Sequence, residues 1–145
     1  MKIRFKQIRS LSYPNKWLLL QGLFLSCLLR LSFKLINFKK TIAILSRFKR
    51  KGAALQVEST GHDVGLYRHL IILSYSFTPV INCLSISTAY WWLMKKNGIV
   101  TDLKFGMRTE QEKLLAHAWL EYEGKSLTAD VQVEKKYTVF KGSIL

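Results

Sequence analysis

The sequence predicts an α+β fold in which several helices precede a small antiparallel sheet. Residues 82–98 form one apolar stretch with a polar start and a glycine stop, which is typical of a buried helix. Residues 99–106 and 114–122 alternate between apolar and polar side chains, as half-buried strands do. Glu123 and Gly124 then suit a two-residue hairpin turn, so the strands on either side of it should run antiparallel.

Three helices are expected ahead of this region, over residues 16–37, 38–51 and 66–75. Asn15 can cap the first helix, whose apolar residues exceed what one amphipathic face needs. That helix should therefore be buried on more than one side. The second helix has a wholly cationic polar face and is expected to end at Gly52.

The helix over residues 82–98 organises the chain because it begins with a cysteine. Asn82 is a good N-cap, Cys83 follows as the first helical residue, and Asn97 with Gly98 offers a left-handed C-cap. A thiol at that position feels the positive end of the helix dipole and the unpaired N–H groups of the first turn, which favour thiolate. Cys83 is therefore a candidate nucleophile, and its backbone N–H is a candidate donor to an oxyanion.

The sheet is expected to place a histidine opposite an acid. Residues 107–113 read as a charged loop before the second strand, and residues 125–130 read as the hairpin partner of that strand. With a two-residue turn, His117 lies opposite Asp130, and opposed side chains on one face are about 4.5–5.5 Å apart. Glu121 shares this face but lies roughly 13 Å away along the strand. Asp130 is therefore expected to orient the imidazole.

Cys83, His117 and Asp130 together have the composition of a thiol acyl-transfer site. The thiolate would attack a carbonyl, the imidazolium would protonate the leaving amine, and the acid would fix the ring, as in cysteine peptidases and transglutaminase-type acyl transferases. Cysteine is also among the most buried residue types, so simple packing is the alternative interpretation. Packing is the default for tryptophans as well, although Trp119 shares the His117 face and is expected to contact a substrate.

The charge of the chain is concentrated in its first part. The net charge is +14, and residues 1–57 contain 13 Lys and Arg without any acid. Such a block suggests an acidic partner, which by charge alone is a peptide, a membrane surface or nucleic acid, although a basic helix face is most often only solvated. Of these partners we expect a peptide or a membrane surface and no nucleic acid. The apolar run that begins at Trp17 covers 13 residues, short of the roughly 20 that a membrane span needs. We expect a cytoplasmic protein, with peripheral membrane contact left open.

The composition predicts neither a cofactor nor a metal. Cys27 and Cys83 have no spacing that pairs them, and the sequence contains no Cys-x-x-Cys or His-x-x-x-His set for zinc. The chain is expected to consist of a basic helical N-terminal extension over residues 1–60 and a core over residues 61–145.

The segment CLSISTAYWWLMKKNGIVTDLKFGMR, followed by LLAHAWLEYEGKSL and an aspartate, resembles the transglutaminase-like core of lasso-peptide maturation proteins, specifically the stand-alone leader peptidase. The pattern is Cys-Leu at the start of an apolar helix, then Ala-His-Ala-Trp-hydrophobic-Glu on a strand, and the likeness covers about residues 66–140. In the family an Asn-Asp pair supplies the acid, whereas Thr128 and Ala129 precede Asp130 here. The resemblance implies a papain/transglutaminase-like core, in which the nucleophile-bearing helix packs on a small antiparallel sheet.

The resemblance also implies an activity and partners. The protein would cleave a ribosomally made precursor at the bond between leader and core peptides, with Cys83 as nucleophile, His117 as general base and acid, and Asp130 as the orienting acid. A small separate recognition protein presents the leader in this family, and an ATP-dependent cyclase then closes the macrolactam ring on the freed core amine.

With only short helices ahead of the core, this chain would need such a partner to hold the leader. We hypothesise that the cationic helices and the apolar region around Trp17 dock that partner or steer the leader toward it. The residues predicted for this role are Lys39, Lys40, Lys49 and Arg50. Two other functions stay open: a noncatalytic, basic scaffold or binding protein of the same fold, and an acyl transferase that passes the thioester to an amine.

Overall fold

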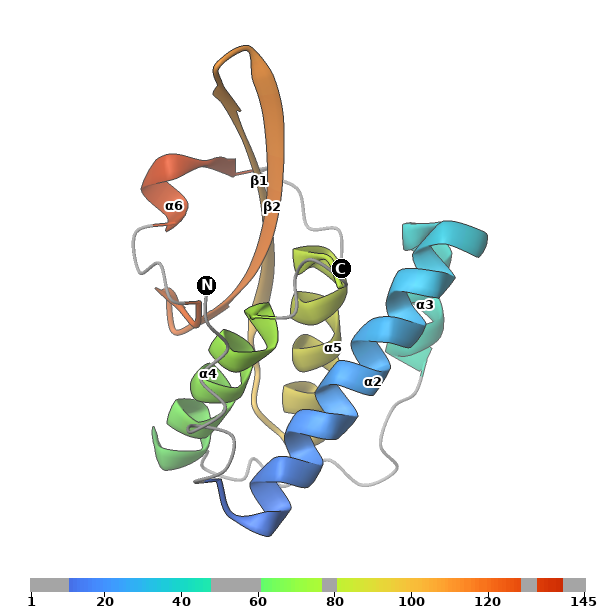
Figure 1. The fold of residues 1–145 in the computed structure, drawn as a ribbon, viewed down its shortest axis with the longest axis vertical. Coiled ribbons are helices and arrows are strands. Elements are labelled where there is room, and N and C mark those ends of the chain that lie inside the picture. The colour runs from blue at the N-terminus through green and yellow to red at the C-terminus, as the bar shows by residue number, and fades with distance from the viewer. Residues whose placement is uncertain (1–10, 48–60, 77–80, 129–132, 140–145) are drawn as a thin grey trace.

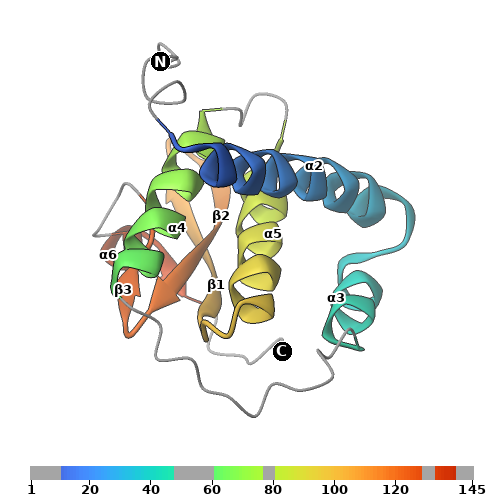
Figure 2. The ribbon, with the colours of Figure 1, turned by 90° about the horizontal axis from the view of Figure 1, so that it is seen from below.

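The computed structural model describes residues 11–47, 61–76, 81–128 and 133–139. Its fold is α+β, as the sequence predicted, with helices on one side of a curled, four-stranded antiparallel sheet (Figure 1). Helix α5 (Cys83–Lys96) packs on the sheet, with α4 (Gly61–Tyr75) beside it. Helix α2 (Tyr13–Leu35) lies across α4 and α5, and α3 (Phe38–Arg47) follows it (Figure 2). The boundary expected at residue 60 falls outside the described residues and stays a prediction.

Helix α2 begins earlier than the sequence predicted. Ser12 has the extended backbone of an N-cap and Pro14 lies in the first turn, where a missing N–H removes no helical hydrogen bond. The prediction that Asn15 caps this helix is therefore wrong, because the helix already includes it. Within the described residues one face of α2 is buried, and its members are Leu19, Gly22, Ser26 and Leu29. In that part of the chain the expectation that α2 is buried on more than one side is wrong.

Helices α2 and α5 approach closely because the residues between them are small. Gly22 faces the ring of Tyr90, and a Cβ built on Gly22 would lie 2.5 Å from the Tyr90 hydroxyl oxygen. Ser26, one turn further, donates its hydroxyl to the Gly22 carbonyl, so it buries no unpaired polar group there. The Tyr90 hydroxyl also makes a 2.8 Å hydrogen bond with the Ser74 hydroxyl of α4. These contacts connect α2, α4 and α5 in one core.

The start of α5 agrees with the sequence prediction. The side chain of Asn82 accepts a hydrogen bond from the Ser85 N–H at 2.9 Å, and Cys83 is the first helical residue. At the other end Gly98 takes the left-handed conformation, with φ of +82°, whereas Asn97 does not. Helix α4 starts five residues before the predicted residue 66. An acid in its first turn, Asp63, suits the positive end of the helix dipole.

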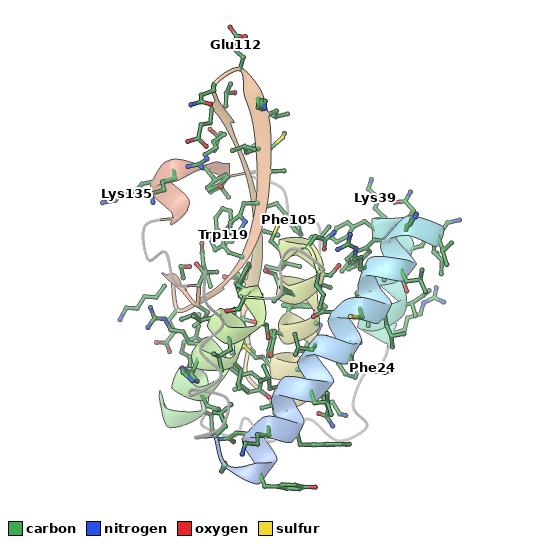
Figure 3. All side chains as sticks on the ribbon, viewed as in Figure 1. Phe24, Lys39, Phe105, Glu112, Trp119 and Lys135 are labelled. Carbon is green, nitrogen blue, oxygen red and sulfur yellow. The ribbon has the colours of Figure 1, made fainter. Side chains whose placement is uncertain are left out.

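The first hairpin is longer than predicted. Strands β1 (Asp102–Glu110) and β2 (Lys113–Tyr122) pair over their full lengths, and the chain turns at Gln111 and Glu112, both of which have positive φ. The prediction of a charged loop over residues 107–113 is therefore wrong. Cross-strand pairing overrides the low strand propensity of the charged tip, and the hairpin extends beyond the helices, with Glu112 at its end (Figure 3).

The second hairpin confirms the predicted turn and its register. Tyr122 pairs with Lys125 across a turn whose two residues both have positive φ, and β3 (Lys125–Ser126) is short. The Leu127 N–H still reaches the Leu120 carbonyl at 2.9 Å, but the chain bends at Thr128. Of the predicted strand over residues 125–130, the structure describes residues 125–128, and of these only Lys125 and Ser126 are strand. Asp130, the expected partner of His117, lies outside the described residues.

The chain then passes to the opposite edge of the sheet. Helix α6 (Val133–Lys136) leads into β4 (Thr138–Val139), which pairs with Gly106 and Met107 of β1, so the strand order is β3-β2-β1-β4. The segment after α6 packs tightly on the sheet, because a Cβ built on Gly106 would lie 2.7 Å from the Tyr137 Cβ. The sheet is therefore covered by the main helices on one side and by this segment on the other.

Candidate active site

Cys83 lies at the N-terminus of a helix, as the sequence predicted. It is a free cysteine, half-buried, at the first position of α5. The N–H groups of a first helical turn have no acceptor within the helix, and only the third of them, from Ser85, is taken by the Asn82 side chain. The Cys83 N–H, in the first turn of α5, is therefore a candidate donor to an oxygen that develops charge next to the sulfur.

A cavity of about 410 Å³ adjoins Cys83. Two of the residues that line it carry the predicted chemistry, Cys83 from α5 and His117 from β2, and the reaction of the thiol with the imidazole stays a prediction. The other lining residues are apolar and come from α3, α5, β1 and β2: Phe38, Leu84, Phe105, Gly106, Met107, Ala116 and Ala118. A peptide carbonyl that entered this space would meet the start of α5 and Cys83 in apolar surroundings.

Aromatic rings surround the His117 imidazole. The Trp119 ring stacks on it at 6.1 Å between centroids, and the Tyr137 ring lies 5.3 Å away. The Tyr75 ring, from the end of α4, lies 6.1 Å away. Tyr75 and Tyr137 come from segments far apart in the sequence, and neither was identified from the sequence. Together these rings restrict the orientation of the imidazole.

Two hydroxyl groups hold β2 against the helices next to His117. Tyr75 Oη and Ser87 Oγ each lie 3.0 Å from the Ala118 carbonyl oxygen, to which each can donate, and 3.0 Å from each other. Ser87 is one turn after Cys83 on α5, and Ala118 is the residue after His117 on β2. We call Tyr75, Ser87 and Ala118 the hydroxyl clamp. It fixes the strand that carries the imidazole against the helix that carries the thiol.

The hydroxyl of Tyr75 stays protonated at neutral pH. Burial raises the pKa of Tyr75 well above its ordinary value of 10.0, although the hydrogen bond with Ser87 acts in the opposite direction. Burial raises the pKa of Tyr90 in the same way. Tyr75 therefore remains a hydrogen-bond donor over the whole range in which a thiol enzyme works.

Glu121 and Trp119 interact with each other. The Trp119 indole N–H donates to Glu121 Oε1 at 2.7 Å, and Lys104 lies 3.9 Å from the same carboxylate. The expectation that Asp130, and not Glu121, orients His117 stays a prediction. Trp119 is fully buried, on the other side of the sheet from Phe105 (Figure 3). Its predicted contact with a substrate therefore stays a prediction that requires the Tyr137 ring, 6.1 Å away, to move.

The remaining predicted site residues divide by whether the structure describes them. Asp130 lies outside the described residues, so its position relative to His117 stays a prediction. Of the four cations predicted to dock a partner, Lys39 and Lys40 are exposed on α3, and Lys49 and Arg50 lie outside the described residues. Phe38, at the start of α3, lines the cavity, so the exposed cations of this helix begin beside it. Among the residues described, no group of three His, Cys, Asp or Glu side chains could hold a metal ion.

Comparison with known proteins adds one finding. The family model described as the transglutaminase-like superfamily matches residues 27–141, which is more than half of the chain. The matched region contains Cys83, His117 and Asp130, and it begins within α2. Neither a curated protein nor a solved structure matches the chain.

Proposed function

The chain belongs to the transglutaminase-like superfamily, and from that premise we propose that it is a cysteine peptidase that removes the leader from a lasso-peptide precursor. The superfamily supports a fold of the cysteine peptidase and acyltransferase type. The observation that carries the proposal further is the cavity that Cys83 and His117 both line. The substrate class rests on the resemblance of the Cys-Leu helix and the Ala-His-Ala-Trp strand to leader peptidases.

The proposed reaction has two steps. The Cys83 thiolate attacks the carbonyl carbon of the peptide bond that joins leader and core, and the Cys83 N–H donates a hydrogen bond to the resulting oxyanion. The C–N bond then breaks, the His117 imidazolium gives its proton to the leaving amine, and the leader stays attached as a thioester. Water, deprotonated by His117, attacks the thioester and releases the leader carboxylate and the thiol. The products are a free leader and a core peptide with a free amine.

Asp130 is proposed to orient the imidazole in both steps. An acid in this role accepts the second ring N–H and stabilises the imidazolium, and its loss costs rate without removing the nucleophile. The Glu121 carboxylate is the other acid on the His117 face, and it contacts Trp119 and Lys104. We retain Asp130 because four residues of extended strand separate Glu121 from His117 by roughly 13 Å.

Leader presentation is proposed to involve α3. Lys39 and Lys40 are exposed on the helix whose Phe38 lines the cavity, so they could attract an acidic segment of the leader or of the presenting protein. Lys49 and Arg50 would extend this basic surface along the sequence. The proposed partners are therefore the precursor and a small leader-recognition protein, with an ATP-dependent cyclase acting on the product in the cytoplasm.

The deciding experiment incubates the protein with precursor and recognition protein and follows leader release by mass spectrometry. Cys83→Ala should release no leader, whereas Cys27→Ala should release it at the wild-type rate. Cys27 is the matched control, because it is the other free cysteine and lies exposed on α2. His117→Asn should also abolish release, and Asp130→Asn should slow it by about 10²-fold or more.

Two other results would each contradict the proposal. Release that is absent from both wild type and Cys83→Ala would favour a noncatalytic scaffold, and equal release by both would exclude Cys83 as the nucleophile. A covalent adduct between the leader and an added amine, formed in place of hydrolysis, would favour acyl transfer. Reversing the charge of Lys39 and Lys40 should slow release most at low salt, and an unchanged rate would remove the assigned role of α3.

A further inference from the structure

Helix α2 carries a second apolar face that no described element covers. Along α2 large apolar side chains recur every three or four residues and are exposed by 46–85%; they are Tyr13, Trp17, Leu20, Phe24, Leu28, Leu31 and Leu35. We call these seven residues the outer stripe. Phe24, in the middle of it, is 64% exposed (Figure 3). A continuous stripe of this length is far more apolar surface than a soluble helix normally presents to water.

The outer stripe lies opposite the face that α2 uses within the fold. The buried face contains Leu19, Gly22, Ser26 and Leu29. With about 100° of rotation per residue, the centres of the two faces are about 180° apart on the helix. The outer stripe is therefore not an incompletely covered edge of the core contact. It is a separate face that points away from α4 and α5.

The charges around the outer stripe are all positive. Lys16, Arg30 and Lys34 are exposed on α2, and Lys39, Lys40 and Arg47 are exposed on α3, which follows it. The sequence from residue 13 to residue 47 contains no Asp or Glu. A second copy of this chain would bring like charges together, whereas anionic phospholipid headgroups would neutralise them.

We propose that the outer stripe is a membrane-docking face, with α2 lying in the headgroup region of an anionic bilayer. Tyr13 and Trp17, at one end of the stripe, have the amphipathic rings that favour this region. Helix α2 is the one helix of the described residues that is long and apolar enough to cross a membrane. Crossing would carry α4 and α5 into the hydrocarbon, because they pack along its buried face. Lying in the interface keeps that packing and buries only the stripe.

This inference stands apart from the proposed peptidase function, because vesicle binding is measured without substrate. The full chain is mixed with vesicles of phosphatidylcholine and phosphatidylglycerol at 3:1, or of phosphatidylcholine alone, and the bound fraction is measured by flotation. Wild type should partition at least tenfold more strongly into the anionic vesicles. The triple variant Leu20→Gln, Phe24→Gln, Leu31→Gln should lose about tenfold or more of that binding.

Matched variants distinguish the contribution of the outer stripe from that of apolar residues elsewhere and from that of the positive charges. Val100 and Leu114 are also exposed, away from α2, so Val100→Gln with Leu114→Gln should leave binding unchanged. Lys16→Glu with Lys34→Glu should weaken binding to the anionic vesicles and leave the weak binding to neutral ones unchanged. The stripe is solvent-exposed, so circular dichroism and thermal unfolding of the triple variant should match wild type.

Four results would overturn the proposal. The first is no binding of wild type to anionic vesicles, and the second is equal binding by wild type and the triple variant. The third is a dimer of the wild type in sedimentation that the triple variant does not form, which would assign the stripe to a second copy. The fourth is capture of the recognition protein through the stripe without vesicle binding, which would assign the stripe to the protein partner.

Discussion

The hydroxyl clamp makes a prediction that can be worked out from its geometry. Successive carbonyls of a strand point in opposite directions, so the Ala118 carbonyl points the same way as the Leu120 carbonyl, which accepts from the N–H of Leu127, the residue after β3. It therefore points away from β1. In the described residues its donors are the hydroxyls of Tyr75 and Ser87. Either hydroxyl alone can donate a hydrogen bond to the Ala118 carbonyl oxygen.

Three variants test this sharing: Tyr75→Phe, Ser87→Ala and the double variant. Each single variant should lower the free energy of unfolding by only about 1 kcal/mol, because one donor to the carbonyl remains. The double variant leaves a buried carbonyl without a donor, which adds about 1–3 kcal/mol to the sum of the two single effects. Ala118 is 2% exposed, so water cannot replace the lost donors without a rearrangement.

Urea unfolding measures the stabilities, and leader release measures the consequence for the site. Because the clamp connects the strand of His117 to the helix of Cys83, the double variant should also slow release by about tenfold or more, while each single variant stays within about threefold. If the double variant loses no more stability than the sum of the single variants, within about 0.5 kcal/mol, the two hydroxyls do not share the carbonyl. The proposed role of the clamp would then be wrong.

Three further predictions concern packing and pH. In thermal unfolding, Gly22→Ala should destabilise the protein by about 1–3 kcal/mol, because the new methyl group meets the Tyr90 ring. Gly65→Ala is the control: it has no atom within 4 Å of the new methyl group and should stabilise the protein by about 0.5–1 kcal/mol. Stabilisation by both variants would contradict the α2–α5 contact. Gly106→Ala should also destabilise by about 1–3 kcal/mol, since its Cβ would lie within 3.1 Å of three atoms, and an unchanged melting temperature would contradict that packing. The free energy of unfolding should fall above about pH 10, because the unfolded chain there loses tyrosine protons that the folded chain retains. The fall should be less steep in Tyr75→Phe. A urea midpoint that stays constant from pH 8 to 11 would contradict this pH dependence.

Local sequence signals predicted those elements whose geometry is set by neighbouring residues. The Asn82 side chain caps the helix it precedes, since the cap bond joins residues three apart. The turn at Glu123 and Gly124 likewise fixed the register of its hairpin. Cys83 was therefore placed at a helix start, and His117 on the adjacent sheet, from the sequence alone.

Local signals were misleading where distant pairing decides the structure. The tip over residues 107–113 has the composition of a loop, yet all of it except the turn at Gln111 and Glu112 is strand, because residues 107–110 pair with residues 113–116 across the hairpin. Asn15 was also misread: it is a residue type that can cap a helix, but it lies inside a helix that begins at Tyr13. In both cases a longer element offers more backbone hydrogen bonds than the shorter one the residues suggest.

The sequence by itself determined which residues could supply the chemistry and on which elements they lie, because helix caps, hairpin turns and alternation act over a few residues. Only the tertiary structure decided that Tyr75 and Ser87 hold the strand of His117, that Tyr137 returns to cover it, and that α2 buries one apolar face and exposes another. These features depend on contacts between residues tens of positions apart, whose side-chain types are common to any apolar core. No local pattern distinguishes an apolar face that packs within the chain from one that is left for a partner.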